Sequence, residues 1–421
     1  DWVNLFVCFS PLPEGGGLKL VPFSSMPDPQ GPVRHAGITI LNLGFRPFFS
    51  GAAMFSFVSM LAWTGLYVFN WHWLPALPGV TWHAHEMIFG YAMAVIAGFL
   101  LTAVRNWTGV QTLHGLPLLL LVLLWFLARL LLAGDSRWLA WAALFDGLFN
   151  LLLVIALAWP VFKVRQFKQI GILSKVLLLM LANLLFYAGA LQIYPWGMQA
   201  GLYSGVYLIM ALIFVMSRRV LPFFIERGLA GSVTLSNRGW LDAASLLLFI
   251  VFWLADIVEP DSLLVASLAA GLCALHAVRL AGWYAAGIWG QPLLWVLFLA
   301  YAAVIAGFAL KVAVYMFGIS PFLPLHAFTY GGIGLFTLGM MARVTLGHTG
   351  RNILEPPAGV AWMFALLVIG SIVRVAFPLL DAARYTLWMG LSQVLWMLAF
   401  FLFMVIFLRM LYQPRADGQP G

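Results

Sequence analysis

Two histidines and a glutamate lie within four residues at the start of a long apolar stretch, "HAHEMIFGYAMAVIAGFLLTAVRNWTG". They are His83, His85 and Glu86. Ionisable side chains are costly inside a hydrophobic segment, where they usually face a cavity or a partner. Imidazole binds copper, iron and zinc, and a carboxylate behind a ligating histidine orients its ring. The spacing therefore indicates a metal site in which Glu86 orients a ligand or handles protons.

Helical geometry separates the two histidines. At about 100° per residue, His83 shares a face with Glu86 and Met87, whereas His85 lies about 160° away. We therefore expect the two histidines to serve different sites, with His83 and Met87 as candidate ligands of one metal.

A second stretch, "HAFTYGGIGLFTLGMMARVTLGHTGR", aligns with the first without gaps and pairs His326 with His85. The pattern predicts one histidine at the outer end of each helix, at similar depth. Two facing histidines can hold a six-coordinate haem, and one of a pair can instead bind copper. Tyr330, one turn below His326, would point at the same site, and we consider Glu86 and Tyr330 as catalytic residues. The alternative is that the histidines are interfacial and are satisfied by water and headgroups.

Three further residues have weaker claims to a site. His72, in the uncharged loop "NWHWLP", is a candidate metal ligand or an interfacial residue among tryptophans. Arg343 and His348 lie at the inner end of the second stretch, within a group of basic residues. These residues either anchor the chain at the membrane surface or bind an anion such as a haem propionate.

The elements that position these residues are membrane-spanning helices. The chain has 421 residues, of which 63% are hydrophobic and 9% are charged, and its mean hydropathy is +0.99. Soluble domains are nearer about 25% charged, so the composition predicts an all-α polytopic membrane protein. Twelve apolar runs have roughly the length of about 20 residues that a crossing needs. They cover residues 47–70, 83–104, 115–133, 137–160, 171–193, 200–217, 241–257, 262–281, 292–316, 325–342, 359–378 and 385–411.

The charge distribution predicts the orientation. Arginines and lysines follow every second run, and this pattern places both termini in the cytoplasm. It also accounts for the net charge of +8 without nucleic acid as a partner. We expect a tail over 1–40, one twelve-helix domain over 41–411 and a second tail over 412–421. Residues 1–25 fit neither a signal peptide nor a helix, and we expect them not to be native because a more ordinary start follows at Met26.

The motifs resemble those of a known family. "LGFRPFF", the two histidine stretches and "RRVLPFF" together resemble the NnrS family from about Leu43 to the end of the last helix. The resemblance implies a bacterial inner-membrane protein of twelve helices that contains haem and copper. It also implies a link to denitrification and to resistance against nitric oxide. Individual ligands are assigned from the residues alone: His85 and His326 for haem b, and His83 for copper.

Three functions compete at this point. The first is a protein that binds nitric oxide and reduces or detoxifies it. The second is a transporter or metal-handling protein that uses the histidines as an uptake site, and the third is a haem-based nitric oxide sensor without turnover. The sequence has no CxxCH, dinucleotide or iron–sulfur motif. Electrons for the first function would therefore come from quinol or from a carrier protein.

Overall fold

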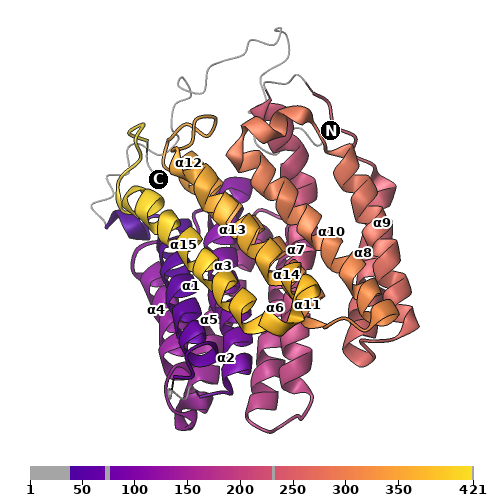
Figure 1. Ribbon diagram of the computed structural model, residues 1–421. Coiled ribbons are helices and arrows are strands. Elements are labelled where there is room, and N and C mark those ends of the chain that lie inside the picture. The colour runs from indigo at the N-terminus through magenta and orange to yellow at the C-terminus, as the bar shows by residue number, and fades with distance from the viewer. Residues whose placement is uncertain (1–37, 72–75, 230–232, 420–421) are drawn as a thin grey trace.

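The structure, a computed structural model, describes residues 38–71, 76–229 and 233–419. This part of the chain is a bundle of helices without β-strands, so the predicted all-α class is confirmed (Figure 1). Within it, eleven helical segments are long and apolar enough to cross a membrane. Six of them are single helices: α1 (Phe45–Tyr67), α4 (Gly115–Leu132), α7 (Gly197–Gly228), α8 (Gly239–Val258), α9 (Leu263–Gly282) and α10 (Pro292–Phe317).

The other five segments join two or more helical pieces. The segment Gly79–Thr108 consists of α2 (Gly79–His85), the π-helix η4 (Glu86–Ala92) and α3 (Met93–Thr108). Short 3₁₀ turns precede α5 (Leu139–Lys163), α6 (Ile170–Ala190) and α15 (Tyr385–Tyr412), and α14 (Phe377–Leu380) follows α13 (Gly359–Val375).

The remaining expected crossing is helical throughout but is not among the eleven. It consists of α11 (Phe322–His326), the π-helix η8 (Ala327–Gly334) and α12 (Leu335–His348). Its glycines and threonines lower its hydropathy, and nearly all of η8 and α12 is buried by neighbouring helices. A helix that is surrounded by protein does not need a lipid-facing apolar surface. The count of twelve crossings and the orientation of the termini remain predictions.

Burial separates central helices from peripheral ones. The most apolar window is 89% buried in the segment Gly79–Thr108 and 72% buried in α7, against 28–50% in the other nine segments. The segment that begins with α2 and the one that begins with α11 therefore both lie inside the bundle. Each becomes a π-helix directly after the histidine that the gapless alignment pairs, at His85 and at His326.

The start of α1 and the end of α15 meet at one end of the bundle, where Figure 1 draws the C-terminus. The fully buried Arg46, from "LGFRPFF", donates through Nη1 to the carbonyls of Leu411 and Gln413, each at 2.8 Å. The C-terminal carbonyls of a helix carry partial negative charge, which favours a nearby cation. Arg46 thus ties α1 to α15.

Candidate functional site

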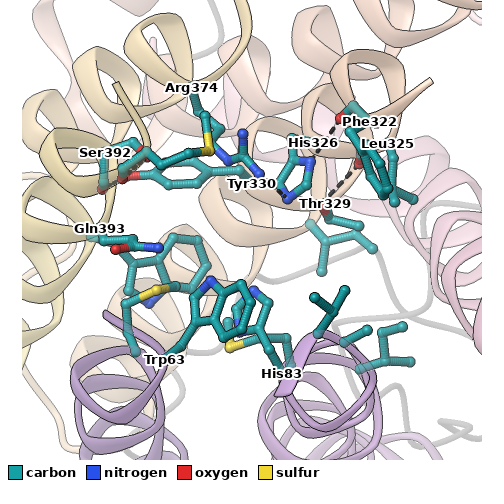
Figure 2. A pocket seen from close by; sticks show the side chains of 18 of the residues that line it. Trp63, His83, Phe322, Leu325, His326, Thr329, Tyr330, Arg374, Ser392 and Gln393 are labelled. Carbon is teal, nitrogen blue, oxygen red and sulfur yellow. Dashed lines mark hydrogen bonds between the residues drawn. The ribbon is translucent and has the colours of Figure 1, made fainter. Parts of the chain in front are cut away.

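A cavity of about 410 Å³ opens between the two central histidine-bearing segments, lined by residues of α1, α7, α13 and α15 as well. Figure 2 shows Trp63 and His83 on one side of it and His326, Tyr330 and Arg374 on the other. Most of its lining is apolar or aromatic, with few polar groups, as is usual for a cofactor or small-molecule site. Among the described residues, no aspartate or glutamate lines it.

His83 reaches the cavity from α2. Its ring stacks on the indole of Trp63 in α1, with ring centroids 4.7 Å apart and planes 7° from parallel. Its Nδ1 is buried and has no hydrogen-bond partner among the described residues. A buried nitrogen without a partner is uncommon in proteins, because its desolvation is not compensated. His83 is therefore held in place by stacking and keeps an unused ligand atom.

His326 reaches the cavity from the end of α11. Its Nδ1 lies 2.7 Å from the carbonyl of Phe322, so this nitrogen carries the proton and donates it. Its Nε2 then holds a lone pair, which accepts a hydrogen bond from Nη2 of Arg374 at 2.9 Å. A carbonyl behind one ring nitrogen is the arrangement that fixes the tautomer of metal-ligating histidines.

Tyr330 lines the same cavity, as the sequence predicts, but its hydroxyl is already engaged. It donates to the carbonyl of Ser392 in α15 at 2.8 Å. Gly370 makes this possible, because a Cβ there would lie 2.0 Å from the tyrosine oxygen. Tyr330 therefore contributes its ring to the cavity wall and links η8 to α15.

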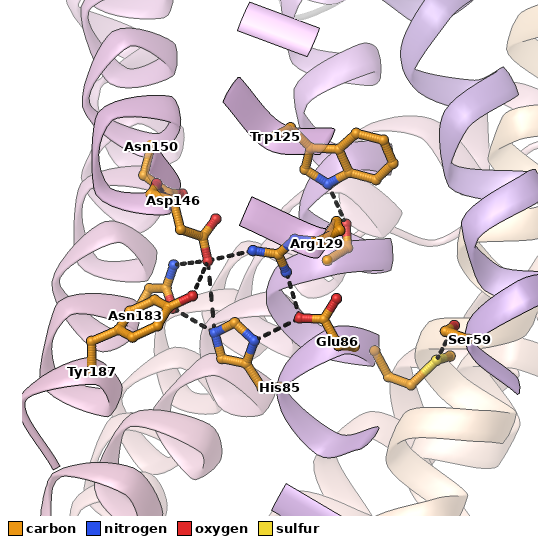
Figure 3. Close-up of polar contacts among 11 residues, drawn as sticks. Ser59, His85, Glu86, Trp125, Arg129, Asp146, Asn150, Asn183 and Tyr187 are labelled. Carbon is orange, nitrogen blue, oxygen red and sulfur yellow. Dashed lines mark hydrogen bonds and ion pairs between the residues drawn. The ribbon is translucent and has the colours of Figure 1, made fainter. Parts of the chain in front are cut away.

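His85 and Glu86 belong to a separate polar network, drawn in Figure 3. His85 Nδ1 lies 2.9 Å from Glu86 Oε1, and Arg129 from α4 reaches the same oxygen at 2.8 Å. Arg129 also pairs with Asp146 of α5 at 2.5 Å. These four side chains are at most 2% exposed. The network thus fastens the histidine segment to α4 and α5.

The amide of Asn183, in α6, contacts the second ring nitrogen of His85. Its Nδ2 donates to Asp146 at 3.0 Å, so its Oδ1 faces His85 Nε2 at 2.9 Å. Both ring nitrogens of His85 therefore face side-chain oxygens and are already engaged. Arg129 is the cation that Glu86 and Asp146 share. A buried network of this kind is satisfied only when its charges are paired.

The structure does not bring His85 and His326 into one site, so this predicted pairing is wrong. His83 shares the cavity with His326 instead, and Glu86 contacts His85 rather than His83. The physical reason is that His83 and His85 point to opposite sides of α2, as about 100° per residue requires. The side that carries His85 meets Asp146 of α5 and Asn183 of α6.

Arg343 and His348 lie far from the cavity. His348 is 22 positions beyond His326 along the same helical segment, which corresponds to roughly 33 Å at about 1.5 Å per residue. Arg343 stacks on the ring of Phe224 at 3.6 Å, and His348 packs beside Phe45. A group bound at His326 is therefore out of reach of both residues. His72 lies outside the described residues.

Sequence reasoning missed Arg129 and gave no role to Trp63 or Arg374. Arg129 interrupts the apolar run "LLLLVLLWFLARLLL", and a lone cation in such a run is a signal of an internal partner. No sequence signal identifies Trp63, because tryptophans are common at membrane interfaces.

The bundle and its histidine-lined cavity define a polytopic helical membrane protein with a candidate ligand site between its helices. The chain matches the family described as NnrS protein over residues 39–415, and it therefore belongs to that family. No match is found among curated proteins.

Proposed function

We propose that this protein is a haem- and copper-containing protein of the bacterial inner membrane that binds nitric oxide and reduces it. Family membership supports a function related to nitric oxide. The observation that carries the proposal is the mostly apolar cavity with His83 and His326 in opposite walls. An apolar pocket suits an uncharged diatomic ligand and a porphyrin ring alike, because neither requires a charged partner.

The residues of the cavity fit a haem b at His326. Its Nδ1 is committed to the carbonyl of Phe322, which leaves Nε2 as the ligand atom. His85 is bound in its own network and we assign His83 to copper, so His326 is the one histidine that the proposal gives to the iron. A haem held by His326 alone would leave a position on the iron for nitric oxide. The protein's contribution is to orient His326 and to exclude water with the aromatic walls.

Copper fits beside it at His83. The unpartnered Nδ1 of His83 and the thioether of Met87 both belong to residues that line the cavity, as do the thioethers of Met60 and Met389. Thioether sulfur and imidazole are ligands that copper accepts. The described residues contain no group of three or more histidine, cysteine or acidic side chains that could hold a metal. A copper site here would therefore combine imidazole with thioether sulfur.

Electrons and protons must both reach the cavity, because reduction of nitric oxide consumes them. We propose a quinol or a carrier protein as the electron donor. Glu86 does not line the cavity and is engaged by His85 and Arg129. Its role is therefore better described as positioning His85 than as delivering protons to a bound ligand.

The test is an absorption spectrum and metal analysis of protein purified in detergent from haem-replete cells. We expect a haem spectrum that His326→Ala abolishes, and copper that His83→Ala removes while haem remains. His114→Ala, at an exposed loop position, is the matched control and should change neither. Colourless, metal-free protein would refute the proposal.

If haem is present, anaerobic consumption of nitric oxide with a chemical reductant separates the remaining functions. Consumption supports a reductase, and binding without consumption supports a sensor. Uptake of copper into proteoliposomes, with neither binding nor consumption of nitric oxide, would support the transport alternative.

A further inference from the structure

Arg374, in α13, is the cation of the cavity and has no carboxylate to neutralise it. It donates to His326 Nε2 at 2.9 Å and to the hydroxyl of Tyr385 at 3.3 Å. In the part of the chain that the structure describes, no aspartate or glutamate lies within ion-pair distance of it. The buried cations Arg129, Arg279 and Lys311 each pair with at least one carboxylate. The fully buried Arg46 donates to backbone carbonyls instead.

The two histidine-bearing segments show what is missing at Arg374. In the first, the residue after His85 is Glu86, which pairs with an arginine of the following transmembrane segment, Arg129. In the second, Arg374 comes from the following segment and contacts His326, but the residue after that histidine is Ala327. The arrangement of histidine, π-helix and arginine is thus repeated, and the carboxylate is not.

The next transmembrane segment, which contains α15, does not supply a carboxylate to Arg374 either. In the first arrangement α5 provides Asp146, whereas α15 presents Ser392 and Gln393 to the cavity. A guanidinium inside a helix bundle is costly unless an anion or several carbonyl oxygens accept its N–H groups, as carbonyls do for Arg46. Among the described residues, Arg374 has only an imidazole nitrogen and a hydroxyl. Its planar set of N–H donors matches two oxygens of a carboxylate or a similar anion.

We infer that Arg374 binds a planar monoanion with two oxygen atoms inside this cavity. The anion is either the carboxylate of a larger molecule, such as a porphyrin propionate, or a free ion such as nitrite or formate. Its oxygens would accept the N–H groups that now face His326 and Tyr385. The lone pair of His326 Nε2 would then be released for a metal. The inference uses the cavity of the proposed function but needs no bound metal.

The first arm of the test measures binding of nitrite and of formate to purified metal-free protein by equilibrium dialysis. The second compares binding of haem with binding of haem dimethyl ester, in which both carboxylates are blocked. Arg374→Gln removes the cation, and Arg374→Lys keeps the charge but loses the two-pronged geometry. Arg343→Gln is the control, because that cation stacks on Phe224 at the far end of the segment.

If the anion is free, nitrite or formate binds, Arg374→Gln weakens binding at least about tenfold, and Arg374→Lys weakens it less. If the anion belongs to a porphyrin, haem binds at least about tenfold more tightly than its dimethyl ester, and Arg374→Gln removes that preference. The inference is overturned if neither anion binds and haem and its ester bind equally. It is also overturned if either preference survives in a monodisperse Arg374→Gln protein.

Failure of the proposed function is a different result. Protein that lacks haem and copper as purified, yet binds nitrite through Arg374, would refute the proposed function and leave this inference standing.

Discussion

Replacing Arg129 by methionine tests whether the polar network around His85 is as tightly coupled as its geometry indicates. The guanidinium lies 2.8 Å from Glu86 Oε1 and 2.5 Å from Asp146 Oδ2. Methionine is shorter but has a similar volume and keeps an unbranched, flexible stem, so it leaves no large cavity. It removes the charge, however, so that the two buried carboxylates lose the cation that both of them contact.

The expected loss follows from burial. Removing one partner of a buried ion pair costs about 3–5 kcal/mol, because the other charge stays desolvated without compensation. Asp146 keeps neutral donors in Asn183 and Tyr187, each at 3.0 Å. Glu86 keeps only His85 among the contacts described. We therefore expect Arg129→Met to lower the free energy of unfolding by about 3–5 kcal/mol, mostly through Glu86.

The assay is equilibrium unfolding in mixed detergent micelles. Arg218→Met is the matched control, since Arg218 pairs with Asp242 at the same 2.5 Å but is 42% exposed. An exposed pair contributes about 0–1 kcal/mol. Adding Glu86→Gln and Asp146→Asn to Arg129→Met should restore much of the loss. Equal, small losses in Arg129→Met and Arg218→Met would refute the reasoning, because they would mean that water reaches the network.

Three further outcomes are expected. Arg46→Gln removes charged hydrogen bonds to the end of α15 and should lower the free energy of unfolding by about 1.5–3 kcal/mol in the same assay. Gly370→Ala should displace the Tyr330 ring, because the added Cβ would lie 2.0 Å from its hydroxyl. If a cavity ligand bound equally well to this variant, Tyr330 would not be part of the cavity wall that contacts the ligand. Hydrogen bonding by Arg415 lowers the pKa of Asp417 from 3.8 to about 2. This contact is therefore complete above about pH 4 and is lost as pH falls through about 2, and hydrogen exchange at Asp417 measures it.

The sequence by itself determined the class of the protein. Long apolar runs predict spanning helices, because crossing hydrocarbon demands both length and composition. The structure finds eleven such segments in the described part of the chain. The exception, Phe322–His348, is instructive. Buried by its neighbours, it carries glycines and threonines that a lipid-facing helix would avoid, so a hydropathy criterion passes over it.

The sequence also located part of the candidate site. Costly side chains at the start of two apolar helices identified His83 and His326, and both line the cavity. The gapless alignment of His85 with His326 corresponds to a structural fact, since a π-helix follows each of them. What the alignment did not reveal is that the two equivalent histidines have different partners.

Tertiary structure decided those partners. Arg129, Asp146 and Asn183 come from three other helices, and their approach gives His85 a charged network rather than a place in the cavity. Residue spacing places His83 and His85 on opposite sides of α2, but it does not say which helices lie on each side. Helix packing then determines which neighbour each face meets. For the same reason, only the structure shows that Arg374 faces the cavity beside His326 without a carboxylate.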